Sequence, residues 1–152
     1  MPYKLFKVPR NMKKKLSIAD CKLIEIPIKN DLRGNLSFIE SNNHIPFNIK
    51  RVYYLYDVPR NESRAGHAHK VLNQFLICLN GEVEILIDDG INERIIILNK
   101  PYVGLLLLPG IWREIRFIKE NSICLCLADQ VYEESDYFRN YNDFKNSVIQ
   151  NK

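Results

Sequence analysis

The chain of 152 residues is long enough for about one domain and leaves no room for a second folded one. Hydrophobic residues make up 46% and charged residues 26% of it, a composition that excludes a disordered protein and is ordinary for a folded one. The net charge of +4 is mild, and a large share of it lies near the N-terminus, so we expect no nucleic-acid binding.

The N-terminus predicts neither secretion nor membrane insertion. Residues 1–15 form a basic N-terminal arm without the apolar core and the small-residue cleavage site of a signal peptide. The longest apolar runs, Gly104–Pro109 and Ser122–Ala128, are far shorter than the roughly 20 residues that span a bilayer. We therefore expect a cytoplasmic protein with no membrane partner, in which the four cysteines are buried reduced thiols.

After the arm, residues 16–152 are predicted to form a single domain of short β-strands. Turn-forming residues separate the segments of strand-like alternation, and Asn80-Gly81 is the strongest hairpin signal. In chain order, the predicted strands are Cys21–Ile28, Asn35–Glu40, Ile49–Val58, Asn73–Leu79, Glu82–Asp88, Glu93–Leu98, Gly104–Leu108, Glu114–Phe117 and Ser122–Leu127. The predicted helix is Ser135–Gln150, capped by Ser135 or Asp136.

Strands at steady spacing, with no helices between them, predict an all-β jelly roll or a related β-barrel with a short C-terminal helix, rather than an α/β fold. The mouth of such a barrel is a common site for a small molecule. Because barrels of this kind often pair through their edge strands, we expect a homodimer, with the N-terminal segment as the exchanged element.

Two of the three histidines, His67 and His69, stand two positions apart in the segment Arg64-Ala-Gly-His-Ala-His-Lys70. On a strand, residues two apart share a face, so both imidazoles point the same way and the small Ala68 points the other way. Imidazole has the side-chain pKa nearest neutrality, and two of them can share the acid and base roles of a proton transfer. The alternative is that both histidines only satisfy hydrogen bonds at a polar strand end.

This segment resembles the first motif of the cupin superfamily, in which a glycine precedes HxH, an acidic residue follows, and a further glycine comes seven residues later. Gln74 stands where the acidic metal ligand is expected, with Gly81 correctly spaced from it. The second motif of metal-binding cupins carries a third histidine after a Pro-Gly turn, and this chain offers Trp112 or Arg113 instead. Two imidazoles and a neutral amide are a poor ligand set for zinc, iron or manganese, so we expect no metal.

Further motifs narrow the resemblance to the sugar 3,4-ketoisomerase family, over residues 18–145. They are Arg51-Val-Tyr-Tyr54 after Ile45-Pro-Phe47, the histidine segment, Leu86-Ile-Asp-Asp-Gly90, Pro109-Gly-Ile-Trp112 and Tyr132-Glu-Glu-Ser-Asp-Tyr137. One departure is Ala65, where a glycine or another small residue is expected. The resemblance implies a homodimeric enzyme without metal or cofactor. Its substrate would be a dTDP-linked 4-keto-6-deoxy sugar, whose keto group moves from C4 to C3 through an enediol.

The resemblance also implies roles for single residues. His69 is expected to be the principal base and His67 its acid–base partner, with the order between them open. Tyr53, which shares a strand face with Arg51, is expected to reach a sugar hydroxyl or the enediolate. The residues expected to bind substrate are Arg51, Arg64, Lys70 and Arg33, whose positive charges suit a pyrophosphate, together with Gln74 and Trp112.

Some residue roles and functions stay open at this point. Trp112 could equally belong to the core, and Asp136 and Tyr137 are expected to fix the C-terminal segment rather than to contact substrate. A nucleotide-sugar epimerase of the same barrel type would deprotonate carbons next to the same ketone. A noncatalytic sugar-binding or regulatory cupin domain would bind without turnover, and a metal-dependent oxygenase would require stoichiometric iron.

Overall fold

The computed structural model describes residues 15–151, so residues 1–14 of the predicted arm lie outside the described part. Strands dominate it. In chain order they are β1 (Lys22–Glu25), β2 (Ile28–Asp31), β3 (Gly34–Ser37), β4 (Arg51–Leu55), β5 (Ser63–His69), β6 (Gln74–Asn80), β7 (Val83–Asp88), β8 (Glu93–Leu98), β9 (Val103–Leu107), β10 (Trp112–Phe117), β11 (Ile123–Ala128) and β12 (Tyr137–Phe138). The helical elements are two 3₁₀ turns, η1 (Ile18–Asp20) and η2 (Glu134–Asp136), and the helix α1 (Tyr141–Gln150).

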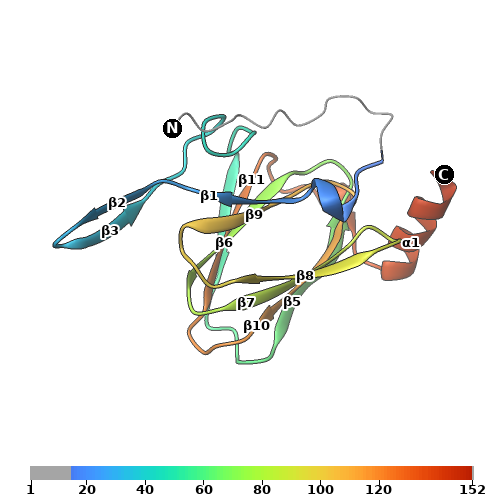
Figure 1. Ribbon diagram of the computed structural model, residues 1–152. Coiled ribbons are helices and arrows are strands. Elements are labelled where there is room, and N and C mark those ends of the chain that lie inside the picture. Colours follow the sequence, from blue (N-terminus) through green and yellow to red (C-terminus); the bar gives the residue numbers. More distant parts are fainter. Residues whose placement is uncertain (1–14, 152) are drawn as a thin grey trace.

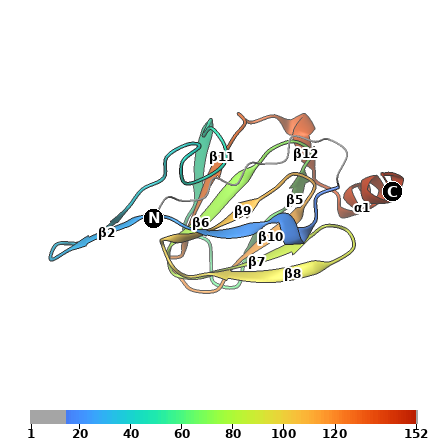
Figure 2. The same cartoon turned by 45° about the horizontal axis from the view of Figure 1, so that its top comes forward.

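The strands form two five-stranded sheets that face each other, as Figures 1 and 2 show. The first has the order β1-β9-β6-β11-β4 and the second β12-β5-β10-β7-β8, with antiparallel pairs throughout. The facing sides carry the hydrophobic core. On β7, for example, Val83 and Ile85 are fully buried, whereas Glu84 between them is partly exposed. The expected jelly roll is thus confirmed, and all four cysteines lie buried in it and unpaired.

Strand β5, which carries the two histidines, was absent from the predicted strands and contains a bulge. In its pairing with β10, His67 lies opposite Arg113 but Ala65 lies opposite Glu114, so Gly66 is an extra residue. Ala65 and Gly66 both have positive φ, at 71° and 76°. Such a bulge twists the strand and changes the direction of the side chains that follow it, here those of the histidine pair.

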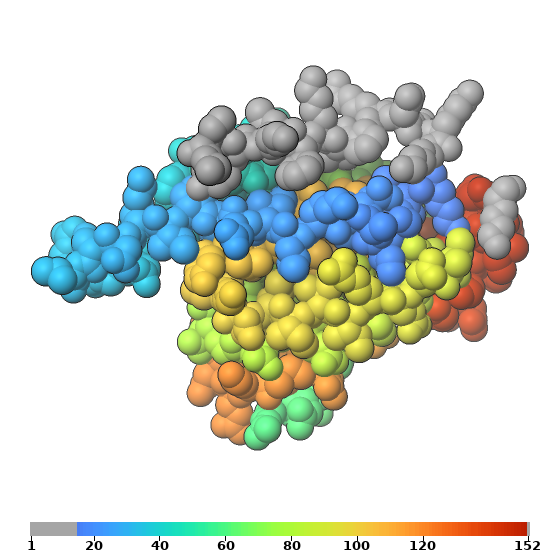
Figure 3. Space-filling model, in the orientation of Figure 1, coloured from blue at the N-terminus to red at the C-terminus, as the bar shows by residue number. Residues whose placement is uncertain are grey.

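The strands predicted from Asn73 to Leu127 are confirmed to within two residues at each end, but the predicted strand Cys21–Ile28 breaks at Pro27. Proline cannot donate a ladder hydrogen bond, so β1 ends before it and pairs with β9. Beyond it, β2 and β3 form a separate hairpin that projects from the body (Figures 1 and 3). Every residue of both hairpin strands is exposed.

The C-terminal helix is confirmed but begins later than predicted, at Tyr141 rather than Ser135. The cap is Asn140, whose side chain accepts from two backbone N–H groups of the first turn. The preceding residues are extended because β12 pairs with β5. Phe144 and Val148 of α1 pack on the outer side of the second sheet. Within residues 15–151, no helix has the length and apolar character needed to cross a membrane.

Candidate active site

His67 and His69 point inward from β5, while Ala68 between them lies on the opposite side, in the cluster under α1. His67 contributes to the wall of a cavity of about 490 Å³, which is in the usual size range for a small-molecule site. The cavity is lined by Arg51, Tyr53, Leu55, Ser63, Arg64, Ala65, His67, Ile115, Tyr132, Tyr137 and Arg139. His69 is fully buried behind His67 and is not part of this wall.

A chain of hydrogen-bonding groups connects His67 at the cavity with Asp136. Its Nε2 lies 3.1 Å from Nε2 of His69, whose Nδ1 lies 2.9 Å from the Oδ2 atom of Asp136. The ring of Tyr137 covers both imidazoles, with centroid distances of 4.9 Å and 4.3 Å. Asp136 and Tyr137, expected only to fix the C-terminal segment, therefore contact the histidine pair directly.

Both histidines are neutral at pH 7. Burial, and after it the guanidinium of Arg113, lowers the pKa of His67 and of His69 to about 3. The carboxylate of Asp136 favours the charged form of His69, but burial and the nearby guanidinium groups outweigh it. A neutral imidazole at the cavity wall has a free lone pair, so His67 can accept a proton.

Arg113 supplies a fixed positive charge next to the histidines, since it lies opposite His67 in the pairing of β10 with β5. Its side chain comes from β10 and is 1% exposed. Its Nη1 donates to Oε1 of Gln74 at 3.1 Å, whereas its Nε and Nη2 have no hydrogen-bond partner within the described residues. Burial lowers its pKa to about 10, which still leaves it charged at pH 7. The sequence analysis noted Arg113 only because it stands near the place of the third histidine of metal-binding cupins.

Gln74 explains why an amide stands where metal-binding cupins have a carboxylate. Its Nε2 donates to the hydroxyl of Tyr53 at 2.8 Å, while its Oε1 accepts from Arg113. A carboxylate could not donate to the tyrosine. Gln74 is 1% exposed and lies outside the cavity wall, so it positions Tyr53 and Arg113. Burial, followed by the contact with Cys126, raises the pKa of Tyr53, which therefore keeps its proton.

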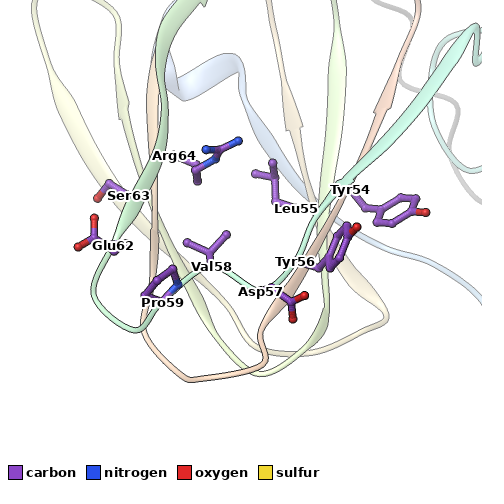
Figure 4. Close-up of a pocket in the computed structure, with 9 residues that line it drawn as sticks. All are labelled: Tyr54, Leu55, Tyr56, Asp57, Val58, Pro59, Glu62, Ser63 and Arg64. Carbon is purple, nitrogen blue, oxygen red and sulfur yellow. The ribbon is translucent and has the colours of Figure 1, made fainter.

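Three arginines contribute to the lining of the cavity. They are Arg51 and Arg64, which the sequence suggested as substrate-binding residues, and Arg139. The guanidinium of Arg139 lies over the ring of Tyr137 at 4.1 Å and forms an ion pair with Glu134 at 2.5 Å. A second, open groove shares Leu55, Ser63 and Arg64 with the cavity, and Figure 4 shows Arg64 pointing between the strands at its edge. Arg64 thus stands where the two hollows meet.

Besides Gln74, three more of the predicted substrate-binding residues do not line this cavity. Trp112 packs outside the sheet against Tyr141 and Phe144 of α1, because the inward position on β10 belongs to its neighbour Arg113. Lys70 donates to the backbone oxygen of Ser135 and lines a different hollow.

Arg33, the third of these residues, lies in the turn of the projecting hairpin. Its side chain is 90% exposed and is ion-paired with Asp31. Within the described residues, no three histidine, cysteine, aspartate or glutamate side chains are grouped closely enough to hold a metal ion.

Comparison with known proteins identifies the family of the chain. Residues 19–149 match the family model described as FdtA: WxcM-like, C-terminal. A TDP-4-oxo-6-deoxy-α-D-glucose 3,4-oxoisomerase from Aneurinibacillus thermoaerophilus is 44% identical over 118 residues, which cover 78% of this chain and 85% of that protein. The chain belongs to this family of sugar 3,4-ketoisomerases.

Solved structures of the family share the fold over almost their whole length. A 3,4-ketoisomerase from Helicobacter canadensis is 42% identical with a TM-score of 0.83, covering 86% of this chain and 98% of its own. A mutant of the 3,4-ketoisomerase QdtA from Thermoanaerobacterium thermosaccharolyticum, in which a histidine is replaced by asparagine, is 40% identical. Its TM-score is 0.85, it covers 88% of this chain and 97% of its own, and it is in complex with TDP-4-keto-6-deoxyglucose.

A dTDP-4-dehydrorhamnose 3,5-epimerase from Bacillus anthracis is more distant. It has a TM-score of 0.69 at 17% identity, covering 78% of this chain and 77% of its own. That likeness concerns the fold alone.

Proposed function

We propose that this protein is a 3,4-ketoisomerase that moves the keto group of a TDP-linked 4-keto-6-deoxy sugar from C4 to C3. The observation that carries the proposal is the neutral imidazole of His67, in the wall of a cavity that three arginine side chains also line. The reaction needs a base for a carbon-bound proton next to a ketone. It also needs cations for the diphosphate that carries the sugar.

The geometry favours His67 over His69 as the base, which reverses the order expected from the sequence. His67 removes the proton from C3, the electron pair of that bond forms a double bond between C3 and C4, and the carbonyl electrons move to the C4 oxygen to give an enediolate. Protonation of that oxygen gives the enediol. The C3 hydroxyl then loses its proton as a proton returns to C4, so that the carbonyl ends at C3. His69 lies behind His67, where it stabilises the imidazolium formed in the first step.

The remaining groups contact different parts of the substrate. Tyr53, held by Gln74 and kept protonated, donates a hydrogen bond to a sugar oxygen, and the charge of Arg113 stabilises the enediolate. Arg51, Arg64 and Arg139 bind the diphosphate, since guanidinium groups match phosphate oxygens in pairs. The chemistry proposed for these residues uses no metal and no cofactor.

The experiment is incubation of the protein with TDP-4-keto-6-deoxyglucose in deuterated water, followed by proton NMR. We expect the keto group at C3 and deuterium at C4, and the coupling of the neighbouring protons reports the configuration at C4. Deuterium next to a ketone that stays at C4 would indicate an epimerase. Tight binding of TDP without any turnover would indicate a noncatalytic domain.

We further propose that the enzyme works in the cytoplasm as a homodimer and binds no nucleic acid. β4 is an edge strand of the first sheet, and its outer side chains Val52 and Tyr54 are 55% and 59% exposed. The fully exposed β2–β3 hairpin can add to such an edge in a second copy of the chain. Arg33 in the hairpin turn would then lie near the partner's cavity, which includes residues of the same strand β4.

A further inference from the structure

Asp136 lies outside the cavity wall and is held by the end of β5. Its Oδ1 accepts the backbone N–H of Val71 at 2.7 Å, and its Oδ2 lies 2.9 Å from Nδ1 of His69. Its backbone oxygen accepts the N–H of Lys70 at 2.8 Å. Both carboxylate oxygens are therefore committed, one to a main-chain donor and one to the inner imidazole.

An ionised carboxylate can only accept hydrogen bonds, so it determines where the protons of both imidazoles lie. His69 must carry its proton on Nδ1, facing Asp136, which leaves Nε2 of His69 as an acceptor. His67 must then carry its proton on Nε2 to donate to that atom. The Nδ1 atom of His67 is consequently left with a free lone pair.

We propose that Asp136 is a positioning residue that sets the tautomer of both histidines and thereby makes Nδ1 of His67 the basic atom. This inference rests on the proposed function insofar as His67 is the base. The same chain spreads the charge formed during the reaction, because a proton taken up by His67 is balanced through His69 by the negative carboxylate.

Replacing Asp136 by asparagine should invert both tautomers. The backbone N–H of Val71 requires an acceptor, so the amide oxygen faces it and the amide NH₂ group faces His69. Nδ1 of His69 must then accept, its Nε2 must donate, and Nε2 of His67 must accept in turn. The proton of His67 moves to Nδ1, and the basic atom of the site loses its lone pair.

The test is nitrogen-15 NMR of the imidazoles in the full-length protein, with His67→Asn and His69→Asn variants to assign the signals. In the wild type we expect His69 protonated at Nδ1 and His67 at Nε2. In Asp136→Asn both assignments should exchange, and kcat should fall on the order of 10³- to 10⁴-fold with little change in KM.

Two further variants separate positioning from a general structural role. Asp136→Glu keeps two acceptor oxygens and should restore the wild-type tautomers, with kcat within about tenfold of the wild type. Asp143→Asn removes an exposed carboxylate from the first turn of α1 and should change neither tautomers nor turnover.

A wild-type spectrum with His67 protonated at Nδ1 overturns the proposal, as does an Asp136→Asn variant whose tautomers are unchanged. If the wild type shows the expected tautomers but does not turn over TDP-4-keto-6-deoxyglucose, the proposed function fails, while the control of the tautomers by Asp136 stands.

Discussion

At the scale of single residues, the two histidines of one motif have different surroundings. His67 reaches the cavity, whereas His69 is fully buried between His67 and Asp136. The pleat of a strand explains why both point inward. It does not explain which of them meets the substrate, since that depends on how deep each residue lies along β5.

Replacement of His67 by asparagine should lower kcat by about 10³-fold, the usual size of a lost general base, and leave the affinity for TDP nearly unchanged. The NMR assay gives kcat, and isothermal titration calorimetry gives the affinity. His44→Asn is the control, because His44 lies away from the cavity and its Nδ1 accepts from a backbone N–H that an asparagine oxygen can also serve. Full turnover by the His67 variant, with none by His69→Asn, would return the base to His69.

The same two histidines should make stability depend on pH. Their pKa is lowered to about 3 in the folded protein, from 6.5 in the unfolded chain, so the unfolded state binds more protons between these values. The free energy of unfolding should therefore rise with pH across this window and fall as the pH drops below 6.5. Urea titrations between pH 5 and 6.5, where ordinary carboxyl groups are already ionised, isolate the histidines. The slope should shrink in a double His67→Asn, His69→Asn variant, and an unchanged slope contradicts the assignment.

At the scale of elements, the bulge of β5 contains a strained backbone conformation directly before the histidine pair. Ala65 has φ of 71°, a left-handed conformation that L side chains adopt only at a cost. The next residue, Gly66, has the same sign of φ at no such cost. The strained pair lies directly before His67, so the geometry of the bulge determines how that imidazole enters the cavity.

We expect Ala65→Gly to raise the free energy of unfolding by about 0.5 kcal/mol, because relief of the left-handed strain is partly offset by the greater freedom of glycine in the unfolded chain. Gly66→Ala should lower the free energy of unfolding by about 1 kcal/mol. It should also reduce kcat, because a changed backbone in the bulge moves the imidazole of His67. Urea denaturation and the NMR assay measure the two effects. Asn61→Gly, at φ of 67°, is the matched control. Its free energy of unfolding should rise by less, because asparagine tolerates the left-handed region. A destabilised Ala65→Gly variant contradicts the argument.

At the scale of the whole molecule, the projecting β2–β3 hairpin and the edge strand β4 both present exposed side chains in residues 15–151. An exposed edge strand with apolar side chains favours pairing with another chain. Both sheets have such an edge, β4 in the first and β8 in the second. The proposed dimer uses β4, and this choice can be tested with one substitution on each edge.

Val52→Asp on β4 and Ile95→Asp on β8 form a matched pair, since the two side chains are 55% and 58% exposed. We expect Val52→Asp to convert the dimer to a monomer at micromolar concentration, because a carboxylate would be buried in the interface. Ile95→Asp should leave the dimer intact. Size-exclusion chromatography with light scattering measures the mass of each, and dissociation by Ile95→Asp alone would place the interface on the other sheet.

What the sequence determined by itself is local. The alternation of apolar and polar residues, together with the turn residues, predicted the strands from Asn73 to Leu127. The separation of His67 and His69 by two positions placed both imidazoles on one strand face. Both features depend only on neighbours along the chain. The tertiary structure decided the rest through contacts between distant strands. Asp136 meets His69 across 67 positions. Pairing with β7 extends β10 back to Trp112, two residues before the predicted strand, and this extension places Arg113 on the inward face with Ile115 and Phe117 and leaves Trp112 on the outward face.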